Sequence, residues 1–155
     1  MLRLTRVTDY GILLMTEMVS KSAPDRWTAN DLSQATHVPA PTVSKILQSL
    51  LRANLLISVR GAQGGYQLAR QASDISLQDI IHCLEGRIAL TECNLENNDC
   101  EQSAFCSTSH HWKRINQSML EALGNISLAD MADEQFMPVF TVKRGVPIQN
   151  ICEVA

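Results

Sequence analysis

The sequence predicts a mainly α-helical protein with one small β-ribbon, and three features of its 155 residues lead to this prediction. A short helix, a tight turn and a longer helix are expected in succession over residues 28–54. Two short β-prone segments joined by a Gly-rich turn follow over residues 55–68. An irregular segment with three cysteines then precedes a long amphipathic helix. The order of elements in the first half is that of a winged helix-turn-helix.

Helical spacing of apolar residues predicts a first amphipathic helix over residues 5–21. Its inward face is expected to consist of Leu4, Val7, Tyr10, Gly11, Leu14 and Met18. The pattern Thr28-x-x-Asp31 is a capping box, in which each side chain accepts a hydrogen bond from the other residue's backbone N–H. This box predicts a second helix over residues 29–36, followed by a turn at residues 37–40.

A third helix is expected to begin at Pro41, because the first position of a helix needs no backbone N–H donor. Its buried face is expected to consist of Val43, Ile46, Leu47, Leu50 and Leu51. Asn54 is the expected C-cap. Beyond the ribbon, the capping box Ser76-x-x-Asp79 predicts a further helix that ends at Gly86.

The second half of the chain divides into a segment without periodicity and a long helix. A stripe at helical spacing predicts that this helix ends near Gly124; its members are Trp112, Ile115, Met119, Ala122 and Leu123. We therefore divide the chain into a winged helix-turn-helix region at 1–86, a cysteine segment at 87–108, a long helix with a short return helix at 109–135, and a tail at 136–155.

Composition limits the compartment and the classes of function. No apolar run approaches the roughly 18 residues that a membrane span needs. Arg3, Arg6 and Asp9 interrupt the N-terminal apolar residues, so no export signal is recognisable and we expect a cytoplasmic protein without a membrane partner. Five cysteines are present, and an odd number in such a chain argues against a disulfide framework.

Charge is distributed unevenly along the chain. Residues 1–80 carry eight Lys or Arg against six Asp or Glu, whereas residues 81–155 carry five against ten. A nucleic-acid surface is therefore expected in the first half. The excess of positive charge there is too small to establish such a surface by itself.

The predicted third helix has the residues of a recognition helix in the major groove of DNA. Its start and its outward face present Pro41, Thr42, Ser44, Lys45 and Gln48. Arg60 stands at the tip of the ribbon, where a cation can enter the minor groove or contact phosphate. Thr28 lies at a helix N-terminus, whose backbone N–H groups can bind phosphate. Winged helices also serve as protein–protein modules, so topology alone leaves that alternative open.

Three cysteines, Cys93, Cys100 and Cys106, lie within fourteen residues of the irregular segment. Thiolates are soft ligands that select zinc, copper(I) or iron–sulfur clusters. The spacing is wider than the Cys-x2-Cys pair usual in structural zinc sites and is compatible with a larger cofactor. Three thiolates leave a fourth position, for which His110, His111 or the more distant Asp9 are candidates.

Other interpretations of the cysteines are free buried thiols, a zinc-stabilised winged-helix interaction module, and a thiol oxidoreductase. The oxidoreductase is disfavoured because the chain has no Cys-x-x-Cys pair and because acidic neighbours raise thiol pKa values. We therefore do not expect an enzyme. Cys83 is expected in the core beside Ile80 and Leu84, and Cys152 in the tail is expected to be incidental.

Four stretches of this sequence together resemble the iron–sulfur transcription regulators related to IscR, NsrR and RirA. They are residues 4–10 (LTRVTDY), residues 41–47 (PTVSKIL), residues 58–68 (SVRGAQGGYQL) and the three-cysteine segment. The resemblance covers about residues 1–135. The helix with the PTVSK sequence looks most like the branch that regulates the SUF iron–sulfur assembly genes.

The resemblance implies a homodimer that binds a double-stranded DNA operator, with the long helix near Trp112 as its interface. It also implies a [2Fe-2S] or [4Fe-4S] cluster on Cys93, Cys100 and Cys106, and control of SUF-type genes in response to cluster status. A nitric-oxide-responsive or iron-responsive repressor of the same family is the alternative. Cluster loading would order the cysteine segment and change the spacing of the two recognition helices.

The sequence departs from the family pattern at two places. The IscR-like pattern has a histidine three residues after the last cysteine, where this chain has Ser109 followed by His110 and His111. Asp9 matches the position from which NsrR-like relatives supply a carboxylate across the dimer, so the fourth ligand stays open. Ser44 replaces a glutamate of the IscR-like recognition helix, so its DNA sequence preference is not transferred to this chain.

Overall fold

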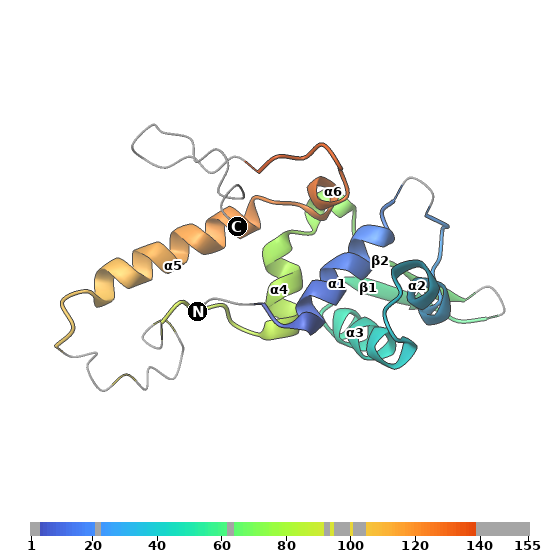
Figure 1. Ribbon diagram of the computed structural model, residues 1–155, viewed down its shortest axis with the longest axis horizontal. Helices are drawn as coiled ribbons and strands as arrows, with labels where there is room; N and C mark the ends of the chain where they lie inside the picture. The colour runs from blue at the N-terminus through green and yellow to red at the C-terminus, as the bar shows by residue number, and fades with distance from the viewer. Residues whose placement is uncertain are drawn as a thin grey trace.

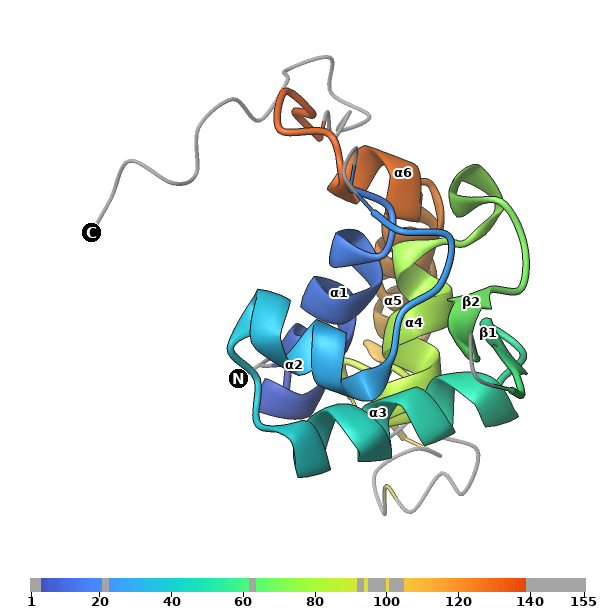
Figure 2. The ribbon, with the colours of Figure 1, turned by 90° about the vertical axis from the view of Figure 1, so that its right-hand side faces the viewer.

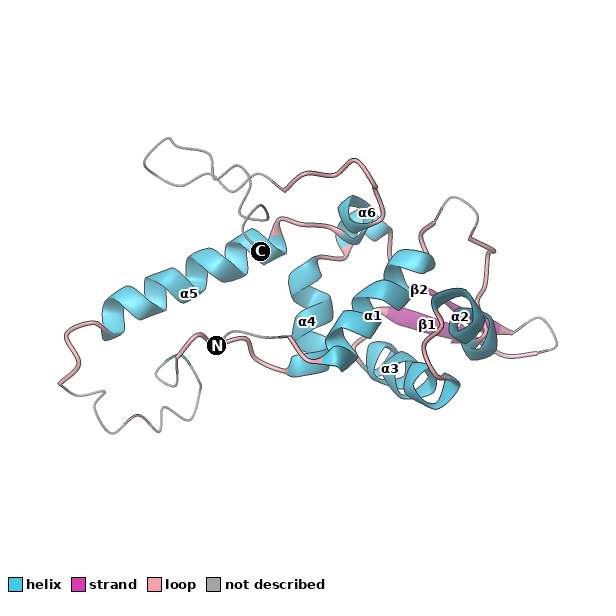
Figure 3. Ribbon diagram, in the orientation of Figure 1, coloured by secondary structure: helices cyan, strands magenta, loops and turns pink. Residues whose placement is uncertain are grey.

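The computed structural model describes residues 4–20, 23–61, 64–91, 94, 100 and 105–138. Helices and two short strands follow in the order predicted for a winged helix (Figures 1 and 3). They are α1 (Arg6–Glu17), α2 (Ala29–Thr36), α3 (Ala40–Arg52), β1 (Leu56–Val59), β2 (Gly65–Leu68), the 3-10 turn η1 (Ala72–Asp74), α4 (Leu77–Glu85), α5 (Ser109–Gly124) and α6 (Leu128–Met131).

Helices α1, α2, α3 and α4 pack around one hydrophobic core (Figure 2). Its fully buried side chains include Leu14, Met15, Leu32, Val43, Leu47, Leu50 and Ile80. Helices α1 and α4 approach closely at Gly11, where a Cβ atom would collide with the Leu84 side chain. This close fit means that α1 and α4 cannot shift independently without repacking.

The first helix is shorter than its apolar pattern predicted. It ends at Glu17 rather than near residue 21, and Leu4 and Val7 of the predicted inward face are exposed. Leu4 precedes α1, which begins at Arg6, and Val7 lies in its first turn. Leu51 of α3 is half-buried rather than buried, because it lies at the edge of the buried stripe.

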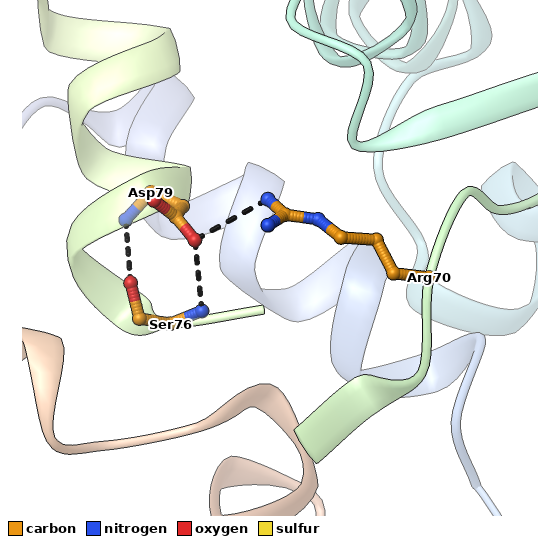
Figure 4. A network of polar contacts seen from close by, with 3 residues as sticks. All are labelled: Arg70, Ser76 and Asp79. Carbon is orange, nitrogen blue, oxygen red and sulfur yellow. Dashed lines mark hydrogen bonds and ion pairs between the residues drawn. The ribbon is translucent and has the colours of Figure 1, made fainter. Parts of the chain in front are cut away.

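Capping boxes begin three of the helices. The two predicted boxes, Thr28 with Asp31 and Ser76 with Asp79, are both present, and a third that the sequence analysis missed, Ser127 with Asp130, opens α6. Figure 4 shows the box of α4, where the Asp79 carboxylate accepts the Ser76 N–H at 3.2 Å and pairs with the Arg70 guanidinium at 3.4 Å. This ion pair joins the end of the ribbon to the start of α4.

The ribbon pairs β1 with β2 in antiparallel register, with Leu56 opposite Leu68 and Val59 opposite Gly65. Trp27 adds a third extended position through two backbone hydrogen bonds with Tyr66, at 2.7 and 3.1 Å. Gly65 permits this approach, since a Cβ atom there would lie 2.8 Å from the Trp27 carbonyl oxygen. The ribbon is thereby fixed to the segment that leads into α2.

Helix α5 extends away from the winged-helix body, as Figure 1 shows, and α6 returns to the body beside α1. Only one α5 residue is buried, Asn116, while Trp112 and Ile115 of the predicted apolar stripe are 41% and 48% exposed. Among the described helices, none combines the length and the apolar character that a membrane span requires.

Candidate DNA-binding face and cysteine segment

Helix α3 divides into a buried face and an outward face. Val43, Ile46, Leu47 and Leu50 are buried, whereas Pro41, Lys45 and Gln48 are exposed and Thr42 and Ser44 are half-buried. Figure 2 shows α3 along one edge of the body, with the ribbon beside its C-terminal end. All five predicted recognition residues therefore lie on α3, and the three exposed ones can reach a partner without any change in the core.

The two cations expected to contact DNA are available to a ligand. The side chains of Lys45 and Arg60 make no hydrogen bond or ion pair with the residues that the structure describes, and both are exposed. Arg60 directly follows β1, and Gly61 next to it adopts a φ of 118°, which a side chain disfavours. A Cβ atom at Gly64 would lie 2.6 Å from the Val59 carbonyl oxygen, so the described ends of the turn require glycine.

Thr28 is engaged by its own helix. Its backbone N–H and its hydroxyl both donate to the Asp31 carboxylate, at 3.0 and 2.7 Å, and the Asp31 N–H donates back at 3.1 Å. These hydrogen bonds lower the pKa of Asp31, so a negative charge stands at the α2 N-terminus. The Thr28 N–H and hydroxyl are therefore already engaged within the capping box, and the predicted phosphate contact of Thr28 stays a prediction.

The cysteine segment is described in part. Cys93 and Cys152 lie outside the described residues, while Cys100 and Cys106 are half-buried free thiols. Among the described residues, no three His, Cys, Asp or Glu side chains form a group that could hold a metal ion. With one of the three predicted cysteine ligands undescribed, the ligand set stays a prediction.

Both ends of the cysteine segment are attached to α5. At the first end, the Leu90 N–H donates to Asn116 Oδ1 at 2.9 Å, and Asn94 Nδ2 donates to the Trp112 carbonyl at 3.5 Å. At the other end, Cys106 Sγ lies 3.3 Å from Thr108 Oγ1. Thr108 and Trp112 are one helical turn apart, a rise of about 6 Å. The Asn94 side chain and the Cys106 thiol thus both contact the stretch from Thr108 to Trp112 at the start of α5.

The thiols of Cys106 and Cys83 differ in their electrostatics. The pKa of Cys106 is lowered by the Thr108 hydroxyl and then by the backbone N–H groups of Thr108 and Ser109. The pKa of Cys83 is raised by burial, and its thiol donates to the Ser49 carbonyl at 3.4 Å. Cys83 packs between α3 and α4 beside the core, as the sequence predicted. Metals bind thiolates, so the lowered pKa of Cys106 is compatible with ligation, which stays a prediction.

The candidate fourth ligands lie in two different helices. His110 and His111 are exposed in the first turn of α5, with ring centroids 6.1 Å apart. Asp9 is exposed in the first turn of α1. The described residues do not bring any of the three together with Cys100 and Cys106 in one group.

Two polar residues of this region escaped the sequence analysis. Asn116 is 7% exposed and receives the Leu90 N–H, and Glu85 receives two hydrogen bonds from the first turn of α1. Each breaks a local rule: an amide stands beside the apolar stripe of α5, and an acid ends α4, where the helix dipole favours a cation. These two departures from the usual helix pattern are the features of the sequence that could have identified Asn116 and Glu85.

The helix-turn-helix, the ribbon and the outward face of α3 define a winged-helix transcription regulator. Residues 4–134 match the Rrf2 family, which is described as "Iron-dependent Transcriptional regulator". The chain therefore belongs to the Rrf2 family of DNA-binding transcription regulators, which are not enzymes.

Relatives and solved structures agree with this assignment. The chain is 30% identical over 138 residues to Protein rrf2 of Nitratidesulfovibrio vulgaris, covering 88% of this chain and 92% of the relative. It is 27% identical over 139 residues to the HTH-type transcriptional regulator IscR of Vibrio cholerae, covering 89% and 80%. These relatives support a regulator across most of the chain.

Two solved structures are similar at 30% identity. The Bacillus subtilis global cysteine regulator CymR has a TM-score of 0.67, covering 85% of this chain and 97% of CymR. T. potens IscR has a TM-score of 0.66, covering 88% and 92%. One of these neighbours is described as a cysteine regulator and the other is an IscR. Family membership alone therefore does not identify a cofactor, which has to be inferred from the residues of this chain.

Proposed function

We propose that the protein is a homodimeric, cytoplasmic regulator that binds operator DNA through α3 and the ribbon and senses an iron–sulfur cluster on Cys93, Cys100 and Cys106. The contacts of the cysteine segment with the start of α5 carry this proposal, because the Asn94 side chain, next in sequence to Cys93, and the Cys106 thiol both contact residues between Thr108 and Trp112. The genes that it controls are proposed to be those of SUF-type iron–sulfur assembly, in line with its resemblance to that branch of regulators.

The donor set fits such a cluster. The lowered pKa of Cys106 favours the thiolate that an iron ion binds, and the half-buried Cys100 is a free thiol of the same segment. A carboxylate or an imidazole in the fourth position, from Asp9, His110 or His111, makes a cluster more labile than four thiolates would. When bound, the cluster would act as the sensor, because iron shortage, oxidants or nitric oxide can remove or alter it.

The residues of the chain convert cofactor binding into DNA binding. Asn116 and Asn94 hold the cysteine segment against α5, and the apolar side of α5 is proposed to pair with a second copy. A dimer reads two half-sites about one helical turn apart, so a small change in the spacing of the two α3 helices changes affinity. The cofactor shifts the equilibrium between the two dimer states only by as much as its affinities for those states differ.

Anaerobic purification followed by an absorption spectrum and by iron and sulfide analysis tests the cofactor. We expect a coloured protein, loss of the chromophore in each single Ala variant of Cys93, Cys100 and Cys106, and an unchanged spectrum in Cys83→Ala and Cys152→Ala. Asp9→Ala and a His110/His111 double Ala variant then identify the fourth ligand by the spectrum that changes. A colourless protein that contains zinc, or one without metal, would contradict the cluster and favour an interaction module or free thiols.

A further inference from the structure

The last residue of α4 holds the first turn of α1. Glu85 Oε1 accepts the Thr5 backbone N–H and the Thr8 hydroxyl, each at 2.6 Å. The Thr8 hydroxyl and then the Thr5 N–H lower the pKa of Glu85, so the carboxylate is charged at neutral pH. A negative charge at a helix N-terminus satisfies its free N–H groups and complements its dipole. One helix therefore supplies an N-terminal cap to another.

This contact has a buried partner on the α1 side. Thr8 is 0% exposed, and it is the only fully buried polar side chain among the described residues. Its hydroxyl also lies 3.3 Å from Thr5 Oγ1, but the charged Glu85 Oε1 at 2.6 Å is the closer acceptor, and losing that hydrogen bond is costly for a buried polar group. The position of the α1 first turn is therefore tied to the position of the Glu85 carboxylate.

Glu85 is also the last helical residue before the cysteine segment. Gly86 ends α4 with a φ of 81°, and Leu90 is already bonded to Asn116 of α5. Residues 86–89 join these two contacts directly along the chain, and the five-residue step from Glu85 to Leu90 spans at most about 17 Å. Figure 1 shows this segment leaving α4 beside the start of α1. A rearrangement of the cysteine segment reaches Glu85 through very few residues.

Helix α1 in turn contacts the DNA-binding elements directly. It packs on α2, α3 and α4, and Leu14 and Met15 of α1 are fully buried among them. The close approach of Gly11 to Leu84 leaves no slack between α1 and α4. A change in how Glu85 holds α1 is therefore transmitted to the packing of α3.

We propose that Glu85 couples the state of the cysteine segment to DNA affinity. This inference rests on the proposed cofactor at Cys93, Cys100 and Cys106. With the segment arranged around its cofactor, Glu85 holds the first turn of α1 in one position relative to α3. Without the cofactor, residues 86–90 adopt another arrangement and shift the Glu85 carboxylate. The first turn of α1 then adopts a second position relative to α3. Glu85 is thus a positioning residue that binds neither cofactor nor DNA.

The test compares operator affinity with and without cofactor. The probe is a DNA fragment selected by sequencing genomic DNA that the purified protein retains. Allosteric coupling of this kind commonly changes affinity 5- to 150-fold. We expect Glu85→Ala to bring the ratio of the two affinities to within about twofold of one while the spectrum and the iron content stay those of the wild type. Glu85→Gln is expected to keep most of the ratio, because its amide oxygen can still accept both hydrogen bonds.

Two further variants control for folding and for general weakening of α4. Thr8→Val keeps the buried shape, removes one of the two donors, and is expected to reduce the ratio by about fivefold. It replaces Glu85→Ala as the deciding variant if the latter does not fold. Arg70→Ala removes the ion pair with Asp79 at the opposite end of α4, shown in Figure 4, and is expected to leave the ratio unchanged.

Hydrogen exchange of the peptide covering residues 40–52, which form α3 and include no candidate cofactor ligand, gives a second readout. Cofactor loading is expected to change its exchange in the wild type and in Arg70→Ala, but not in Glu85→Ala. Loaded Glu85→Ala and Thr8→Val variants that keep the wild-type ratio and the wild-type exchange response would overturn the coupling role. A wild type without a cluster would instead overturn the proposed function, and with it the coupling, before any variant is needed.

Discussion

In the winged-helix body, Leu14, Leu32 and Leu47 are fully buried, whereas Trp112 and Ile115 on α5 leave 41% and 48% of their surfaces exposed. Both regions carry apolar residues at helical spacing, and both form helices. The body completes its core within one chain, while the start of α5 keeps apolar side chains that the described residues cover only in part. We therefore expect the body to fold as a unit, and we propose that a second copy of the chain covers this side of α5.

The largest effect is expected from charges on the exposed side of α5. Ile115→Asp combined with Met119→Asp should weaken the dimer at least about a thousandfold, since each apolar side chain buried in an interface contributes roughly 1.5–3 kcal/mol. Sedimentation velocity measures the loss. Arg114→Asp, on the other side of α5, is the matched control and should remain dimeric. A dimer that persists in the double variant would place the interface elsewhere and end the contrast between the two regions.

Truncations in the two regions should also differ in cost. Leu47→Ala, in the body, should lower the free energy of unfolding by about 2–5 kcal/mol, because it leaves a cavity. Leu123→Ala on α5, where the side chain is only half-buried, should cost about 1 kcal/mol or less at concentrations that keep the protein monomeric. Urea unfolding at low and high protein concentration measures both. Equal costs at low concentration would show that α5 is part of the same cooperative core.

The same contrast explains how far the sequence could be interpreted. In the body, local signals and burial agree: the capping boxes at Thr28 and Ser76 and the stripe of α3 predicted helices within one or two residues. The end of α1 was overestimated, because the apolar period continues past Glu17 while the backbone already turns toward the next helix. Ala53 is the C-cap of α3, where Asn54 was predicted. Asn54 is the next residue and adopts a left-handed conformation with a φ of 55°.

For the cysteine segment, the sequence could predict a ligand-binding site but not its structure. Three thiols in an aperiodic stretch indicate a ligand, but no local rule states which backbone groups hold that stretch. Its attachments to Asn116 and to Trp112 of α5 join residues far apart in the sequence, and they depend on tertiary packing. Glu85 was missed for the same reason, since its partners Thr5 and Thr8 are about eighty residues away in the sequence.

Within the body, the DNA face should respond to loss of its free cations. Lys45→Ala and Arg60→Ala should each weaken operator binding several-fold at physiological salt, and each should reduce the log–log salt slope by about 0.9 if its contact is to phosphate. Fluorescence anisotropy at several salt concentrations gives affinity and slope together. Arg70→Ala is a suitable control, because Arg70 already pairs with Asp79. Unchanged affinity and slope for both variants would remove this face from DNA binding.

The smallest effect separates a cap from a DNA contact at Thr28. Its hydroxyl bonds the Asp31 carboxylate and receives the Asp31 N–H, so Thr28→Ala should lower the free energy of unfolding by about 1 kcal/mol. Thr28→Ser keeps both hydrogen bonds and should cost almost nothing. Because the hydroxyl is engaged in the capping box and carries no charge, operator affinity and its salt slope should both stay those of the wild type in both variants. Operator binding several-fold weaker in Thr28→Ala but not in Thr28→Ser would instead assign the hydroxyl to a phosphate, and the capping box would then be rearranged in the complex.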